Sequence, residues 1–137
     1  MYLQADMANY PGSNYTENSS GTVKVFEDKN DLWIKMNMVG VAPNCSPAET
    51  QKNGCGVHIH AGTTCSDAAQ VGDHYFNPNI FSTDPWVSIR YNSNSAGRSE
   101  DYIHMVGGNG YDLNQNKNRA MVIHDANGTR ISCGLLY

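Results

Sequence analysis

Short runs of alternating apolar and polar residues follow one another along this chain, separated by clusters of Gly, Asn, Asp, Ser and Pro. Alternation of this kind is typical of β-strands with one buried face, and no stretch carries a convincing helical stripe. Many short strands with polar turns predict an all-β Greek-key barrel or sandwich of about eight antiparallel strands. The pattern places strands at 22–26, 32–39, 56–60, 86–91, 101–106, 119–124 and 130–136, the first two joined as a hairpin.

The first part of the chain lacks this alternation. Residues 1–20 are rich in Asn, Ser, Tyr and Gly, and we expect them to form a flexible N-terminal arm. A chain of 137 residues is long enough for one domain with a substantial core. We therefore expect a single β-barrel domain at 21–137.

Two histidines are spaced for one face of a strand. Side chains two residues apart on a strand point the same way, so His58 and His60 are expected to stand side by side. Two more histidines, His74 and His124, are candidates to complete a metal site, and neutral imidazole suits copper and zinc best. The alternative is that His58 and His60 are ordinary strand histidines, one buried and one exposed.

Several short motifs occur in a fixed order along the chain. They are the strand Gly56–His60, the cysteine Cys65, the histidine His74 before an aromatic-Asn-Pro turn, the run Met121–His124, and the terminal run Arg130–Gly134. This ordered set resembles the copper-zinc superoxide dismutase family, and the resemblance covers roughly residues 21–137. One departure is Tyr75, which stands between His74 and Phe-Asn-Pro.

The resemblance implies a superoxide dismutase-like fold and a copper site. His58, His60, His74 and His124 match the ligands of one copper ion, and Arg130 matches the cation that attracts the superoxide anion. The implied reaction disproportionates superoxide to O₂ and hydrogen peroxide through Cu(II)/Cu(I) cycling. In the family, the histidine matched by His74 also takes up and delivers a proton.

The zinc ligands of the family are missing from this sequence. No histidine lies between His74 and His104, so we expect no zinc and a resemblance to the copper-only branch. His74 matches the histidine that bridges copper and zinc in zinc-containing members. In the copper-only branch a carboxylate stands behind that histidine, and Asp84 is the candidate. The alternative is that Asp84 only opens an Asp-Pro turn. The link from His124 to Arg130 is short, which leaves the copper position open to solvent.

Four cysteines indicate an oxidising compartment. They allow three pairings, of which the resemblance selects Cys65 with Cys133 and leaves Cys45 with Cys55. A cysteine-rich zinc site is the alternative, but the sequence has no Cys-x-x-Cys. Secretion is also favoured by four Asn-x-Ser/Thr sequons, at Asn14, Asn18, Asn44 and Asn127. The polar start of the chain is no signal peptide, and we expect Met1 to replace a removed leader.

Charge and hydropathy exclude two classes of partner. The net charge is −4 and the chain has no basic patch, which disfavours nucleic acid as a partner. The chain also lacks a run of about 20 apolar residues, the length that a membrane-spanning helix needs. The expected partner is superoxide, as a small anionic substrate. A non-catalytic extracellular protein on the same fold, associated with matrix or mineral or carrying copper, stays open as the alternative. A sugar-oxidising copper enzyme is disfavoured because the N-terminal histidine clamp is missing.

The remaining metal-binding residue types are expected to have structural roles. His104 lies between apolar residues on a strand that supplies no ligand in the family, and we expect it to be a surface or cross-strand histidine. Four strand methionines are expected to pack in the core and not to bind copper, namely Met36, Met38, Met105 and Met121.

Overall fold

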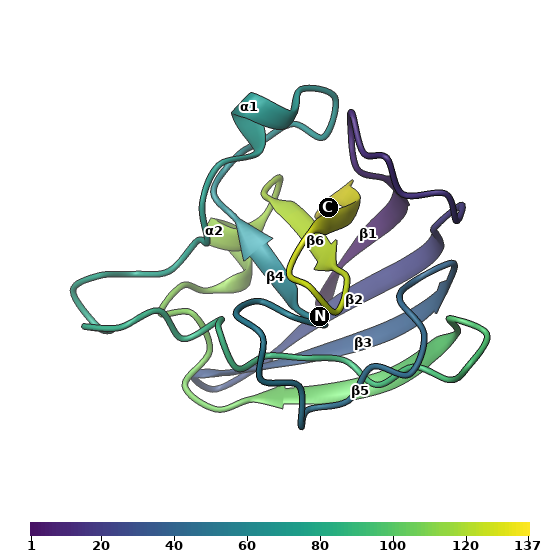
Figure 1. Ribbon diagram of the computed structural model, residues 1–137. Coiled ribbons are helices and arrows are strands. Elements are labelled where there is room, and N and C mark those ends of the chain that lie inside the picture. Colours follow the sequence, from purple (N-terminus) through teal and green to yellow (C-terminus); the bar gives the residue numbers. More distant parts are fainter.

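The computed structural model describes all residues, 1–137, and contains one antiparallel sheet of seven strands that curls into half a barrel (Figure 1). The strand order is β4-β6-β7-β1-β2-β3-β5, which requires long crossovers before and after β4. The expected all-β class is confirmed. The strands are β1 (Tyr2–Asn9), β2 (Ser20–Asp28), β3 (Asp31–Val39), β4 (Val57–His60), β5 (Ser99–Met105), β6 (Ala120–His124) and β7 (Arg130–Leu135).

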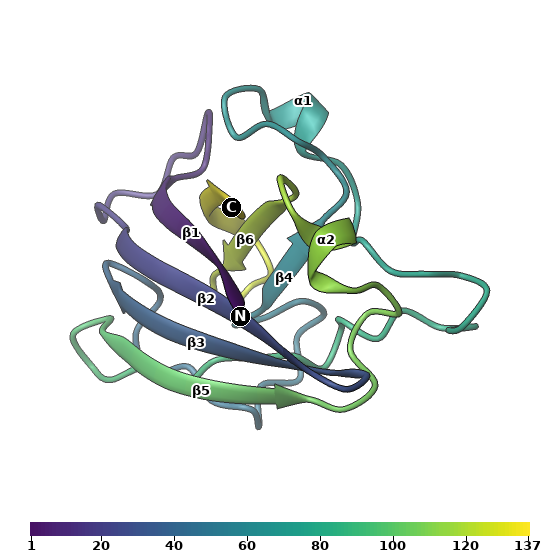
Figure 2. The same cartoon turned by 180° about the vertical axis from the view of Figure 1, so that it is seen from behind.

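Two helices of one turn each lie in the connections. They are α1 (Ala68–Val71) and α2 (Leu113–Asn116), and Figure 2 shows α1 at the top of the molecule and α2 to the side of the short strands β4 and β6. Each begins at an aspartate whose side chain accepts a backbone N–H of the first turn, Asp67 for α1 and Asp112 for α2. Neither is long and apolar enough to cross a membrane.

The hairpin expected between 22 and 39 is present and longer than expected. β2 and β3 pair from Ser20 opposite Val39 to Asp28 opposite Asp31. Lys29 occupies the left-handed region at the turn, with φ of 57°.

The prediction of a flexible arm at 1–20 is wrong for the first strand. Tyr2–Asn9 form β1, which pairs with β2 on one side and β7 on the other, near the middle of the sheet. Leu3, Ala5 and Met7 alternate along it and are buried, and this apolar period holds the strand in place. The folded unit therefore begins at Tyr2 and not at residue 21. In the sequence, the polar residues on the outer face of β1 make its alternation hard to recognise.

The strand expected at 86–91 is absent, and this stretch consists of turns with one isolated bridge between Gly56 and Arg90. Its start is bent because the Asp84 carboxylate accepts the Trp86 N–H at 2.8 Å. A local side-chain acceptor of this kind competes with strand pairing. The stretch still lies along β4, since the Ile89 carbonyl accepts the Val57 N–H at 3.3 Å.

The core has two parts, one on each face of the short strands. The larger part fills the curled sheet, and the smaller part consists of Tyr10, Val71, Ala120, Val122 and Cys133. β6 contributes to both, because its five residues are all buried. The four strand methionines all belong to the larger part, so their expected role in core packing is confirmed.

His104 lies on the outer face of the sheet and does not belong to the cluster of the other four histidines. It stacks on Trp33 of the neighbouring strand with ring centroids 4.0 Å apart, and its Nε2 is 2.7 Å from an Asp31 oxygen. The expectation of a cross-strand surface histidine is confirmed.

Candidate metal centre

β4 brings the first two histidines to one face. Val57 and Ile59 point into the larger core, so His58 and His60 point to the opposite face, where both are fully buried. Gly56 makes room for the first imidazole, because a Cβ at this position would lie 2.5 Å from the His58 ring. The sequence Gly-Val-His-Ile-His therefore encodes both the alternation and the space.

β6 brings the third histidine to the same face. It pairs with β4, and His124 follows Val122 on the face opposite Met121 and Ile123. The ladder between β6 and β7 is irregular at Ile123/His124, and such bulges change the direction of a side chain. The Tyr91 hydroxyl donates to the His124 carbonyl at 2.7 Å and fixes this end of the strand.

The fourth histidine comes from the long loop after β4. His74 forms an isolated bridge with His60, and the flanking backbone follows the free edge of β4. The Ala61 N–H donates to the Asp73 carbonyl and the Tyr75 N–H donates to the Ile59 carbonyl, each at 2.8 Å. Backbone pairing therefore carries the side chain of His74 to the two histidines of β4.

The four imidazoles converge on one point. One ring nitrogen from each of His58, His60, His74 and His124 lies within 4.8 Å of the others. Among them, His58 Nδ1 lies 3.1 Å from His74 Nε2. Three of the rings are buried, and the His74 side chain is 9% exposed. The structure thus brings together all four histidines that the sequence singled out.

Three of these imidazoles are held through the nitrogen that faces away from the cluster. His58 Nε2 donates to the Ile89 carbonyl at 2.9 Å, His60 Nδ1 to the Gly72 carbonyl at 2.9 Å, and His124 Nδ1 to the Gly56 carbonyl at 3.3 Å. A carbonyl only accepts, so these nitrogens carry the protons and the inner nitrogens carry lone pairs.

The arrangement fits a metal ion. His60 Nε2 is buried and has no hydrogen-bond partner in the protein. An unpartnered buried acceptor is costly, and a cation among the lone pairs would satisfy it. An all-imidazole set matches the ligand preferences of copper and zinc.

Burial keeps the imidazoles of His58, His60 and His124 neutral. Loss of hydration holds the pKa of His58 well below its usual value, and the neighbouring histidines add to the effect. Burial lowers the pKa of His60 to about 2 and that of His124 to about 3. The Arg130 charge lowers the pKa of both further. These three residues therefore offer lone pairs at neutral pH without having to lose a proton.

A carboxylate stands behind the fourth imidazole. Asp84 Oδ2 is 2.5 Å from His74 Nδ1, and Asp84 Oδ1 accepts the Trp86 N–H. Asp84 therefore opens the turn at Asp-Pro and also contacts His74, so the two interpretations of this residue are compatible. Trp86 is fully buried, and its indole N–H donates to the Tyr75 carbonyl at 2.9 Å, which ties the Asp84 turn to the His74 loop.

A guanidinium lies beside the histidines. Arg130 opens β7, opposite His124, and is half-buried. Its Nη2 donates to the Gly72 carbonyl at 2.9 Å, and its Nη1 donates to the Tyr10 hydroxyl at 2.9 Å. The Gly72 carbonyl thus serves both Arg130 and His60. The sequence contained no signal for the Tyr10 contact, because the two residues are separated by 120 positions.

The residue that departs from the family pattern has a packing role. The Tyr75 ring stacks on Tyr111 with centroids 4.4 Å apart, and the Arg119 guanidinium lies 4.4 Å from the Tyr75 ring. Arg119 also donates to the Ala61 carbonyl at 2.7 Å. Tyr75 therefore points away from the histidines, and its presence does not displace His74 from the cluster.

Both expected disulfides are formed. Cys65 pairs with Cys133 and Cys45 with Cys55, and no free cysteine remains. The first bond joins the loop that carries Gly72 to β7, which carries Arg130. The second lies just before β4. The first disulfide thus connects a loop to a strand next to the histidine site, and the second closes the loop that leads into β4.

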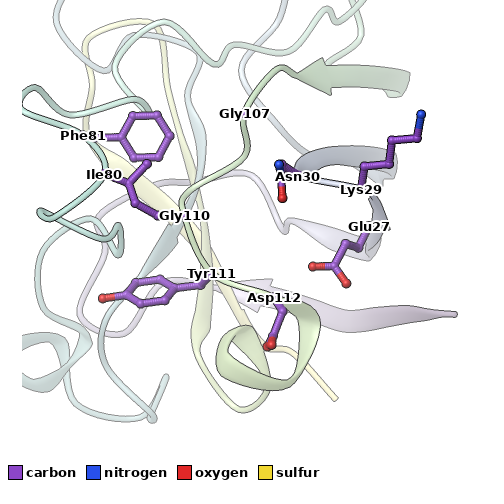
Figure 3. A pocket seen from close by; sticks show the side chains of 9 residues that line it. All are labelled: Glu27, Lys29, Asn30, Ile80, Phe81, Gly107, Gly110, Tyr111 and Asp112. Atoms are coloured by element: carbon purple, nitrogen blue, oxygen red, sulfur yellow. The ribbon is translucent and has the colours of Figure 1, made fainter.

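A separate hollow of about 410 Å³ lies at another part of the molecule (Figure 3). Figure 3 shows Ile80 and Phe81 on one side of it, and Glu27, Lys29 and Asn30 of the β2–β3 hairpin on the other. None of the four clustered histidines lines it. Its mixed charges do not converge on a point, unlike the nitrogens of the histidine cluster.

Comparison with known proteins places the fold. The structure is similar to the Cu/Zn superoxide dismutase from Brucella abortus, with a TM-score of 0.71, 18% identity and full coverage of both chains. The chain has a superoxide dismutase-like fold. A variant of superoxide dismutase 5 from Candida albicans gives a TM-score of 0.58 at 16% identity, covering 98% of this chain and 89% of that one.

A third similar structure is described as the clock protein EA4. It gives a TM-score of 0.63 at 15% identity, covering 98% of this chain and 92% of that one. No protein-family model matches the sequence, and no curated protein matches it. At these identities the similarity establishes the fold, and the chemistry has to be argued from the site itself.

Proposed function

We propose that this protein is an extracellular copper-only superoxide dismutase. The observation that carries the proposal is the convergence of four imidazole nitrogens, with the Asp84 carboxylate behind His74 and the Arg130 cation alongside. The similar structures from Brucella abortus and Candida albicans are both superoxide dismutases by name, which supports the same chemistry here.

The proposed ligands of the copper ion are His58 through Nδ1, and His60, His74 and His124 through Nε2. A copper ion held by these residues would supply one-electron redox chemistry, by which one superoxide would be oxidised to O₂ and a second reduced. The second superoxide leaves as hydrogen peroxide after it gains two protons. Imidazole ligands are compatible with both oxidation states.

His74 is the proposed proton carrier. Its Nδ1–H is held by the Asp84 carboxylate at 2.5 Å, so proton exchange takes place at Nε2, inside the cluster. It is also the most exposed of the four rings, which gives it access to solvent protons. Arg130 contributes by attracting the anion and holding it beside the copper position.

The proposal excludes a structural zinc ion. Zinc behind His74 would need further nitrogen, sulfur or carboxylate ligands around Nδ1. Here a single carboxylate, Asp84, is bonded to that nitrogen, and the chain has no further histidine in the loop that follows. We infer that the Asp84 carboxylate orients His74 in place of a second cation.

The proposal of an extracellular location rests on the two disulfides and on the four glycosylation sequons. Both disulfides are formed, and disulfides persist in oxidising environments. The asparagines of all four sequons are exposed, as glycosylation would require: Asn14, Asn18, Asn44 and Asn127.

A non-catalytic copper-binding or matrix-associated protein is the second candidate. It is favoured by the similarity to a protein described as a clock protein, since this fold is found under more than one description. Arg130 argues against it, because copper storage alone has no need of a fixed cation beside the metal.

Measuring superoxide decay separates the two candidates. Pulse radiolysis of the parent protein, loaded with one equivalent of copper, is expected to show fast decay of superoxide. Arg130→Ala is expected to slow the decay by about tenfold or more and to weaken its salt dependence, because the guanidinium attracts the anion.

The matched control is Arg98→Ala, which removes an exposed arginine paired with Glu100 on the outer face and should leave the rate almost unchanged. Copper bound at one equivalent without superoxide decay would favour the non-catalytic candidate. A full equivalent of tightly bound zinc in metal analysis would contradict the copper-only part of the proposal.

Asp84→Asn is expected to lower copper affinity by about 10- to 100-fold. The asparagine oxygen can still accept the Trp86 N–H, but the asparagine NH₂ group would then face His74 Nδ1 and would have to donate to it. To accept this donor, His74 must carry its proton on Nε2, where the metal would bind. Competition against a copper chelator measures the effect.

Asp73→Asn is the matched control, since it removes the same charge next to His74 from a residue that is exposed. Equal copper affinity and equal copper EPR spectra in parent and Asp84→Asn protein would show that the carboxylate does not act on His74.

A further inference from the structure

We propose that Tyr10 is a positioning residue that holds the Arg130 guanidinium beside the four-histidine site. The inference deepens the proposed function and rests on it, since it concerns the residue that guides the anion. It depends on contacts between the N-terminal segment, the loop after β4, and β7.

The hydrogen bonds of the Tyr10 hydroxyl have a defined direction. Arg130 Nη1 lies 2.9 Å from the hydroxyl and can only donate, so the oxygen accepts. The hydroxyl proton is then free to point to the Ala68 carbonyl at 3.3 Å, in α1. Tyr10 therefore connects Arg130 to α1, and its ring is nearly buried, in contact with Val71 and Cys133 of the smaller core.

Two hydrogen bonds anchor the Arg130 guanidinium in the protein, and the guanidinium also lies 5.8 Å from the centroid of the Tyr10 ring, which Tyr10→Phe retains. Besides Tyr10, it donates to the Gly72 carbonyl at 2.9 Å, which also accepts from His60 Nδ1. Two anchors on different nitrogens define the plane and the position of the guanidinium. Without the Tyr10 hydroxyl only one remains, and a long side chain with one anchor can rotate away from the histidines.

The same two residues line a hollow of about 600 Å³, which contains none of the four histidines in its lining and which Arg130 joins to the histidine site. Ala68, Asp125 and Thr129 also line it, and Arg130 is its only positively charged side chain. The other N–H groups of the guanidinium have no protein acceptor and can therefore donate to an anion that enters from this side. The bond to Tyr10 therefore fixes the direction in which these free N–H groups point.

Tyr10→Phe removes the hydroxyl and keeps the ring in the smaller core. In the copper-loaded protein, the Kd for azide, measured from the visible spectrum of Cu(II), is expected to rise by about three- to tenfold. In the metal-free protein, phenylglyoxal is expected to modify Arg130 faster, as measured by mass spectrometry. Tyr102→Phe, on the outer face of the sheet, is the matched control and should change neither value.

A double variant tests whether Tyr10 acts through Arg130. In an Arg130→Ala background, Tyr10→Phe is expected to cause no further loss of azide affinity. An unchanged azide Kd in the single variant, an equal loss in both backgrounds, or unchanged phenylglyoxal reactivity would overturn the proposal. These readouts do not require superoxide turnover, so a protein that fails as a dismutase can still show the Tyr10 effect.

Discussion

Replacing His124 with alanine is expected to abolish tight copper binding and catalysed superoxide decay. His124 is almost fully buried, and its Nδ1 is tied to the Gly56 carbonyl, so its Nε2 is available only to the site. Changes that only disturb the support of a ligand cost about 10- to 100-fold in metal affinity. Loss of the ligand itself should therefore lower copper affinity by at least about 100-fold, measured by chelator competition.

The fold should survive this substitution, which keeps the test specific. The neighbouring β6 residues remain packed in both parts of the core, and the backbone contact from Tyr91 does not involve the imidazole. A urea midpoint close to that of the parent would show this. His104→Ala is the matched control, because His104 contacts Trp33 and Asp31 on the outer face. Undiminished copper affinity in His124→Ala would contradict the four-histidine site.

Removing the long-range disulfide is expected to produce the largest loss of stability. Cys65 and Cys133 are 68 positions apart, and opening that loop costs about 4 kcal/mol in the chain-entropy description of the unfolded state. The paired change Cys65→Ser with Cys133→Ser should lower the free energy of unfolding by about this amount, measured by urea denaturation. Copper affinity should fall as well, because the loop carries the Gly72 carbonyl that holds His60.

The second disulfide provides the matched comparison. Cys45 and Cys55 are separated by 10 positions, for which the same description gives about 3 kcal/mol. Its removal should therefore cost less, although both of its cysteines are buried in the larger core. Equal stability of the parent and the Cys65/Cys133 variant would show that the loop is held by packing alone.

The β architecture and half of the metal site could be read from local sequence. Alternation within β2 and β3 identified their buried faces, and the His-x-His spacing on β4 determines that His58 and His60 share a face. The resemblance in motif order added His74 and His124 and the two cysteine pairings. The first strand could also have been found, because Leu3, Ala5 and Met7 alternate, but its polar outer face hid the pattern.

The tertiary structure alone decided how these parts meet. The bend at Asp84 replaced an expected strand, since a carboxylate that accepts the Trp86 N–H competes with pairing along β4. The acceptors that orient the imidazoles are carbonyls of Gly56, Gly72 and Ile89, and a backbone carbonyl has no sequence signature. The contact of Tyr10 with Arg130 likewise joins the two ends of the chain. Local spacing determines which face a side chain occupies, whereas partners distant in sequence come together only when the sheet curls and its loops close over it.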